Sequence, residues 1–119
     1  MKKMLRIILI VLPFIINCRK PEIVSASIKI INWSQEYYEY LEEWGLVKVD
    51  YEIENTGNVT IDYYEVYFQV ICTDGSKYQD WDNGTHVNVG DVISDYTYID
   101  VGGKKAISVK ISDYKLEHY

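Results

Sequence analysis

Residues 45–76, "GLVKVDYEIENTGNVTIDYYEVYFQVICTDGS", contain two alternating segments that decide the fold. In the first, apolar residues at odd positions from Val47 to Ile53 alternate with charged residues. In the second, one face of the alternation carries Tyr64, Val66, Phe68, Val70 and Cys72. This period of two is typical of strands that are buried on one face. The turn-forming residues Asn55, Gly57 and Asn58 separate the two predicted strands.

Shorter extended segments lie on both sides of this region, at 25–33, 76–81, 86–91, 92–101 and 106–116. Asp74-Gly75 is a two-residue hairpin signal, and Asn83-Gly84 indicates a further turn. The count is about seven strands with no long helix. The chain is therefore predicted to be all-β, an antiparallel sandwich formed by residues 25–119. In that sandwich Cys72 is expected to be a buried thiol that packs as a small hydrophobe.

Residues 34–45, "SQEYYEYLEEWG", allow two interpretations. Tyr37, Tyr40, Leu41 and Trp44 fall at helical spacing, with Ser34 placed to cap a short helix. The three Tyr and one Trp in the segment favour a strand instead. We expect a strand to about Tyr40 followed by a turn, with the short helix as the alternative.

The first 18 residues have the layout of a secretion signal. The basic stretch "MKKMLR" precedes the apolar run "IILIVLPFII" and then Asn17-Cys18. A transmembrane helix needs about 20 apolar residues, so this run is too short to span a membrane but fits a signal peptide. The order Ile15-Ile16-Asn17-Cys18 resembles a bacterial lipobox, although Asn17 stands where a small residue is usual.

The lipobox resemblance implies that residues 1–17 are removed and that Cys18 carries two acyl chains. Two chains suffice for stable anchoring, at about 0.8 kcal/mol for each buried CH₂. Residues 18–24 would then be the lipidated Cys and a tether. An ordinary secretion signal that leaves Cys18 as a thiol, or an uncleaved anchor, are the alternatives.

Part of the predicted sandwich also resembles a known family. The stretch "YEIENTGNVTIDYYEVYFQVICTDGS" is similar to small immunoglobulin-like domains of the FxLYD type, which occur in prokaryotic lipoproteins. The matching residues are Asn55, Phe68, Val70, Asp74 and Gly75, whereas Ile71 and Cys72 replace the Tyr and Asp of the motif. The resemblance implies an immunoglobulin-like β-sandwich at the cell surface. It implies no enzymatic activity.

The charge of the chain bears on its partners. The formal net charge is −6, and three of the twelve basic residues stand at positions 2, 3 and 6, ahead of the apolar run. An acidic body repels phosphate backbones, so nucleic-acid binding is not expected.

No catalytic motif is recognisable in the sequence. The stretch "DWDNGTH" offers Asp80 and Asp82 as weak ligands for Ca²⁺, but its spacing does not fit an EF-hand, so no metal is expected. No nucleophile turn such as GxSxG accompanies His86 or His118, and His118 is expected to lie in a frayed terminus. We therefore expect a protein that is not an enzyme and needs no cofactor.

Aromatic residues are the strongest indication of a binding surface. The sequence has twelve Tyr and three Trp against two Phe, and side chains with apolar bodies and polar tips suit such surfaces. The candidate surface comprises Tyr63, Tyr67, Tyr78, Trp81, Tyr96 and Tyr98. Alternatively, these residues form cross-strand pairs that need no partner, worth about 0.2–1 kcal/mol each.

Together these features predict a lipid-anchored domain of the cell envelope that faces the periplasm or the exterior. Its role would be non-catalytic, either binding or structural. The expected partners are the membrane, through Cys18, and a protein or a glycan. A glycan or small-ligand module built on the exposed Tyr and Trp, or a Ca²⁺-dependent interaction module, are the alternatives.

If Cys18 is lipidated, the mature protein has a defined N-terminus and a defined mass. Protein recovered from the membranes of its native host should begin at Cys18 and carry the added mass of a diacylglycerol group. Intact mass spectrometry checks this. A chain that is cleaved elsewhere with Cys18 unmodified, or one that keeps Met1, would contradict the lipobox interpretation.

Overall fold

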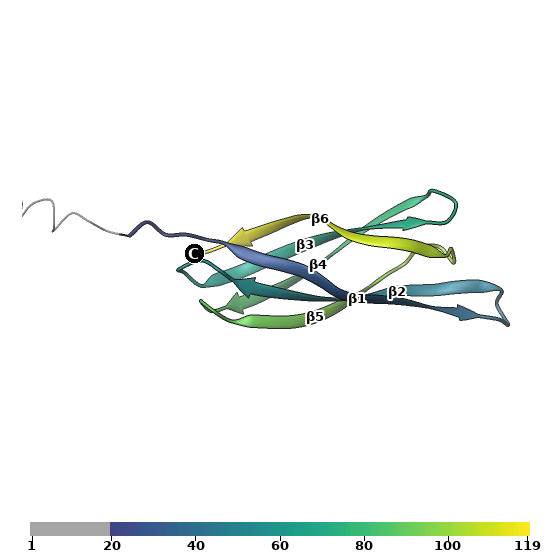
Figure 1. Cartoon of the computed structure of the whole chain (residues 1–119), viewed down its shortest axis with the longest axis horizontal. Coiled ribbons are helices and arrows are strands. Elements are labelled where there is room, and N and C mark those ends of the chain that lie inside the picture. Colours follow the sequence, from purple (N-terminus) through teal and green to yellow (C-terminus); the bar gives the residue numbers. More distant parts are fainter. Residues whose placement is uncertain (1–19) are drawn as a thin grey trace, which may run out of the picture.

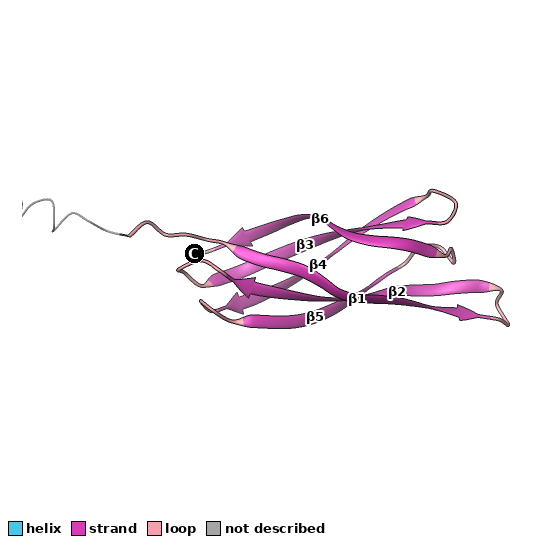
Figure 2. Cartoon of the chain, viewed as in Figure 1, coloured by secondary structure: helices cyan, strands magenta, loops and turns pink. Residues whose placement is uncertain are grey.

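The computed structural model describes residues 20–119, in which six β-strands form two antiparallel sheets packed face to face (Figure 1). The strands are β1 (Ala26–Tyr38), β2 (Glu43–Asn55), β3 (Ile61–Cys72), β4 (Lys77–Val87), β5 (Val92–Ile99) and β6 (Ala106–Glu117). Sheet A has the order β1-β2-β5, and sheet B has the order β4-β3-β6. The predicted all-β antiparallel sandwich is confirmed, and Figure 2 shows strands and loops but no helix among the described residues.

The two segments with the clearest alternation, β2 and β3, are the central strands of the two sheets. Their apolar faces point at each other and supply most of the fully buried side chains. The rings of Tyr51 and Phe68 meet across the sandwich with centroids 5.4 Å apart. Cys72 is buried and free, which confirms that it packs as a small hydrophobe.

The structure has six strands among residues 20–119 where about seven were predicted, because the Asn83-Gly84 turn does not form. Residues 77–87 run as one strand, and Gly84 pairs with Tyr64 in the middle of it. A Cβ at Gly84 would collide with the Tyr64 ring. Glycine is therefore needed here for the close approach of a side chain rather than for a turn.

Residues 34–45 form a hairpin, so the strand interpretation was correct and the helical alternative was wrong. β1 ends at Tyr38, two residues before the predicted end, and β2 begins at Glu43. The turn is closed by backbone bonds from Leu41 N to Tyr38 O and from Glu42 N to Glu39 O, both 3.2 Å long.

Residues 20–25, before β1, are fastened to the β2–β3 loop. Asn58 accepts a hydrogen bond from Ile23 N (2.7 Å) and donates one to Pro21 O (3.0 Å). Thr56 N donates to Ser25 O at 3.0 Å. These bonds fix where the chain enters the sandwich. The predicted signal peptide of residues 1–17 and Cys18 lie outside the described residues.

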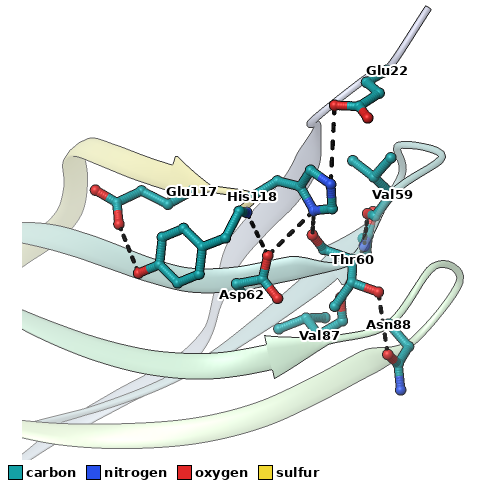
Figure 3. A network of polar contacts seen from close by, with 10 residues as sticks. Glu22, Val59, Thr60, Asp62, Val87, Asn88, Glu117 and His118 are labelled. Carbon is teal, nitrogen blue, oxygen red and sulfur yellow. Dashed lines mark hydrogen bonds and ion pairs between the residues drawn. The ribbon is translucent and has the colours of Figure 1, made fainter.

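The C-terminus is fastened at the same end of the molecule, so the expectation that His118 is frayed was wrong (Figure 3). His118 Nδ1 lies 2.7 Å from the carbonyl oxygen of Thr60 and 3.3 Å from Asp62 Oδ2. Since a carbonyl oxygen only accepts, Nδ1 carries the proton in this bond. Tyr119 N donates to Asp62 Oδ2 at 2.7 Å, and Glu22 approaches His118 Nε2 at 4.0 Å.

Asn55 is the buried polar residue where the chain leaves sheet A for sheet B; its exposed fraction is 2%. Its amide nitrogen donates to Val59 O (2.8 Å) and Val87 O (2.9 Å), and its side-chain oxygen accepts from Gly57 N (3.0 Å). One side chain thus ties β2 to the following loop and to the end of β4. This gives a physical reason for an Asn at the end of the alternating strand.

Replacing Asn55 by Ala should lower the free energy of unfolding by about 2–4 kcal/mol, because buried backbone groups lose their partners. Urea unfolding followed by near-ultraviolet circular dichroism measures the change. The matched control is Asn83→Ala, since Asn83 is exposed and makes one side-chain hydrogen bond of 3.5 Å. Its effect should stay within about 0.5 kcal/mol. Equal losses in the two variants would refute the role assigned to Asn55.

Candidate functional site

The structure divides the six aromatic residues of the predicted binding surface between different surfaces. Tyr96 and Tyr98 lie on the outer side of sheet A. Tyr63, Tyr67 and Trp81 lie on the outer side of sheet B, opposite the buried face of β3. Tyr78 points to the inner side and packs against the core. No single platform therefore holds the whole set.

The outer side of sheet A carries the more exposed aromatic group. Tyr96 and Tyr98 are 54% and 51% exposed, and their rings meet edge to face with centroids 5.8 Å apart. Lys48 of β2 places its Nζ 4.8 Å from the centre of the Tyr96 ring and 3.7 Å from Asp50 Oδ1. A cation here lies between a π face and a carboxylate, both of which attract it. We call Leu46, Lys48, Tyr96 and Tyr98 the tyrosine face.

Two shallow grooves adjoin the tyrosine face. The larger, of about 240 Å³, lies beside Tyr98 and extends to Ser34, Glu36, Tyr38 and Leu46. The smaller, of about 200 Å³, lies beside Tyr96 and Ile31. Pockets for small molecules usually measure about 300–1,000 Å³ and enclose their ligand. Grooves of this size on an open sheet suit the protruding side chains of a larger partner better than an enclosed metabolite.

The β1–β2 hairpin extends the exposed aromatic surface from the tyrosine face to the end of the sandwich (Figure 1). We call residues 36–46 the distal hairpin, because its turn lies at the end of the molecule opposite the entry of residues 20–25 (Figure 1). Tyr40 at its turn is 84% exposed. Tyr38 lies 6.5 Å from Tyr40 between ring centroids and also lines the groove beside Tyr98. The aromatic surface therefore runs from Tyr96 to the tip.

The distal hairpin also concentrates negative charge. It contains Glu36, Glu39, Glu42 and Glu43, and within residues 20–119 no Lys, Arg or His lies within 4.0 Å of their carboxylates. Glu36 and Tyr38 line the same groove, and the charge of Glu36 raises the pKa of the Tyr38 hydroxyl. This site was not among those predicted from the sequence, although Tyr and Glu residues visibly interleave between positions 36 and 43.

The outer side of sheet B has a smaller aromatic group. Tyr67 and Trp81 are opposite each other in the register of β3 and β4, and their rings stack with centroids 6.2 Å apart at an angle of 27°. The Tyr67 hydroxyl donates to both carboxylate oxygens of Glu65, at 3.2 and 3.1 Å. Trp81 remains 48% exposed. This arrangement is a cross-strand pair that leaves a flat ring open to solvent.

The weak Ca²⁺ candidates Asp80 and Asp82 lie on the inner side of sheet B, in register with Phe68 and Val66. Tyr51 donates a hydrogen bond of 2.6 Å to Asp82 Oδ2. Burial raises the pKa of the Tyr51 hydroxyl far above its usual value, so the hydroxyl remains a donor at physiological pH. Among residues 20–119, no group of three His, Cys, Asp or Glu side chains is placed to hold a metal ion.

Comparisons with models of protein families, with curated proteins and with solved structures find no match to this chain. Its class is thus defined by the structure itself, as a small antiparallel β-sandwich with an exposed tyrosine face. In the part of the chain that the structure describes, no helix is long and apolar enough to cross a membrane.

The ammonium group of Lys48 lies over the Tyr96 ring, and both side chains are partly exposed. We therefore expect their contact to contribute to the free energy of unfolding. A double-mutant cycle with Lys48→Met and Tyr96→Leu should give a coupling of about 0.5–1 kcal/mol. Urea unfolding of the four proteins provides the numbers. Lys77 and Tyr96 lie in different sheets, and the same cycle on that pair serves as the control with zero coupling. Zero coupling for Lys48 would show that the ring does not hold the cation.

Proposed function

We propose that this protein is a lipid-anchored, non-catalytic binding domain of the cell envelope, with a protein partner on the tyrosine face. One observation carries the proposal: the exposed aromatic surface runs to the end of the molecule that lies farthest from the entry of residues 20–25 (Figure 1). A domain tethered to a membrane by its N-terminus would hold such a surface away from the lipid.

The sequence layout around Cys18 supports the anchor, through the basic stretch, the short apolar run and the lipobox-like ending. The sandwich supports an immunoglobulin-like domain of the FxLYD type. Its sheets group the first, second and fifth strands against the third, fourth and sixth. Strands A, B and E of an immunoglobulin domain similarly face strands C and F. Asn55, one of the residues that match the FxLYD pattern, has a structural role there, because its side chain satisfies backbone groups at the turn after β2.

A non-catalytic role is supported by the structural contacts of three side chains that could otherwise take part in catalysis. Cys72 is buried in the core, Asp82 accepts a hydrogen bond from Tyr51, and His118 holds the C-terminus. A general base has to reach a proton on a substrate, and these three groups are occupied in holding the fold.

A glycan on the outer side of sheet B is the second candidate, and the stacked pair Tyr67–Trp81 favours it. The flat, half-exposed indole offers a stacking surface to a sugar ring, and the Glu65 carboxylate, which is bonded to the hydroxyl of the stacked Tyr67, offers a hydrogen-bond acceptor. On a glycan array, a signal lost in both Tyr67→Ala and Trp81→Ala would support this candidate, and a blank array would count against it.

Site-specific photo-cross-linking in the native host tests the protein partner. A benzophenone amino acid at position 98 of the full-length chain should give a discrete protein adduct, because the partner covers Tyr98. The same group at position 79, exposed on the outer side of sheet B, should give none. Failure at position 98 under conditions in which the chain is folded and on the membrane would overturn the proposal.

A further inference from the structure

The partner of the tyrosine face can be characterised further by what already binds to aromatic rings within this chain. Lys48 lies over Tyr96 and near Asp50, as described above. Lys104 repeats the arrangement, with its Nζ 5.6 Å from the centre of the Tyr78 ring and 3.0 Å from Asp74 Oδ2. In both cases an ammonium group is shared between a tyrosine ring and a carboxylate.

At Tyr38 and Tyr40 the distal hairpin contains the same two components, and among the described residues no cation lies over either ring. Tyr38 and Glu36 line the same groove, and the exposed Tyr40 stands between Glu39 and Glu42 in the turn. Within residues 20–119 no basic group neutralises these three carboxylates. Two lysines close to the hairpin already have partners: Lys105 places its Nζ 5.3 Å from the centre of the Trp44 ring, and Lys48, which lines the groove with Glu36 and Tyr38, lies 3.7 Å from Asp50 Oδ1.

The distal hairpin combines exposed apolar side chains with an acidic rim, and a binding partner has to match both features. Leu41 and Leu46 are about half exposed beside the tyrosine rings, so part of the surface favours apolar contact. The unpaired carboxylates favour positive charge and disfavour an acidic partner. An anionic lipid surface is disfavoured for the same reason.

We propose that the distal hairpin and the adjoining tyrosine face bind a basic protein segment, whose Lys or Arg side chains lie over Tyr38 and Tyr40 between the flanking glutamates. Arg is favoured as the best-matched group, because its planar guanidinium stacks on a ring and can pair with a carboxylate at the same time. This inference rests on the proposed function and specifies the chemistry of the partner.

The test uses the full-length chain in a neutral detergent and a fluorescent nonapeptide of alternating Gly and Lys or Arg. Fluorescence anisotropy should show saturable binding that weakens as salt is added. A matched peptide with Glu in place of Lys and Arg should not bind. Absence of binding by the basic peptide would overturn the inference.

The variants separate a specific site from general attraction to an acidic protein. Glu39→Gln combined with Glu42→Gln should weaken binding about tenfold, which corresponds to about 1.4 kcal/mol. The control is Glu22→Gln combined with Glu54→Gln, which removes the same charge from exposed residues at the opposite end and should change binding less than about twofold. Equal weakening by the two pairs would overturn the inference.

The contribution of the aromatic rings to peptide binding can be tested with two equally exposed tyrosines. Tyr40 and Tyr119 are 84% and 83% exposed and lie at opposite ends of the molecule. Tyr40→Ala should weaken binding severalfold, whereas Tyr119→Ala should not. If the peptide fails to bind while position 98 still cross-links to a protein, the basic partner is wrong and the proposed function stands. If cross-linking fails as well, both fall.

Discussion

The contact between the buried faces of β2 and β3 is the constraint on which the rest of the structure depends. Each is the middle strand of its sheet, so each needs its apolar face covered by the other sheet. They follow each other in the chain, and the five residues between them carry the chain from one sheet to the other. Asn55 makes that crossing possible, because its buried amide satisfies backbone groups that the turn would otherwise leave unpaired.

Much of the fold could be predicted because it depends on this alternation. Where one face of a strand is buried and the other is charged, period and register follow from the residue types alone. The prediction failed at Gly84, whose Asn-Gly pair has the composition of a hairpin turn. What decides the outcome is the ring of Tyr64, twenty residues earlier in the chain, and a local pattern holds no information on that contact. His118 was misjudged for the same reason, since Asp62 and Thr60 reach it only in the folded chain.

The candidate site was predicted less well than the fold. A list of exposed aromatic residues can be drawn from the sequence, but their distribution over two opposite faces follows from which strands pair. Tyr67 and Trp81 face each other because β3 pairs with β4, whereas Tyr96 and Tyr98 belong to the other sheet. The hairpin at 36–46 was overlooked because its residues suited helix and strand alike. The structure shows that this segment is a hairpin whose tyrosines and glutamates are exposed at one end of the molecule.

The course of β1 has a mechanical consequence. This single strand begins at Ala26, beside the entry of residues 20–25, and ends at Tyr38, where the hairpin turns. A partner pulling on the hairpin of an anchored molecule would load β1 along its own axis. A β-strand rises about 3.3 Å per residue, close to the maximum reach of a polypeptide. The path from Ala26 to Tyr38 is therefore nearly fully extended, apart from register shifts at Ile30/Asn32 and Gln35/Tyr37, and in an anchored molecule tension would pass along it with little lengthening of the chain.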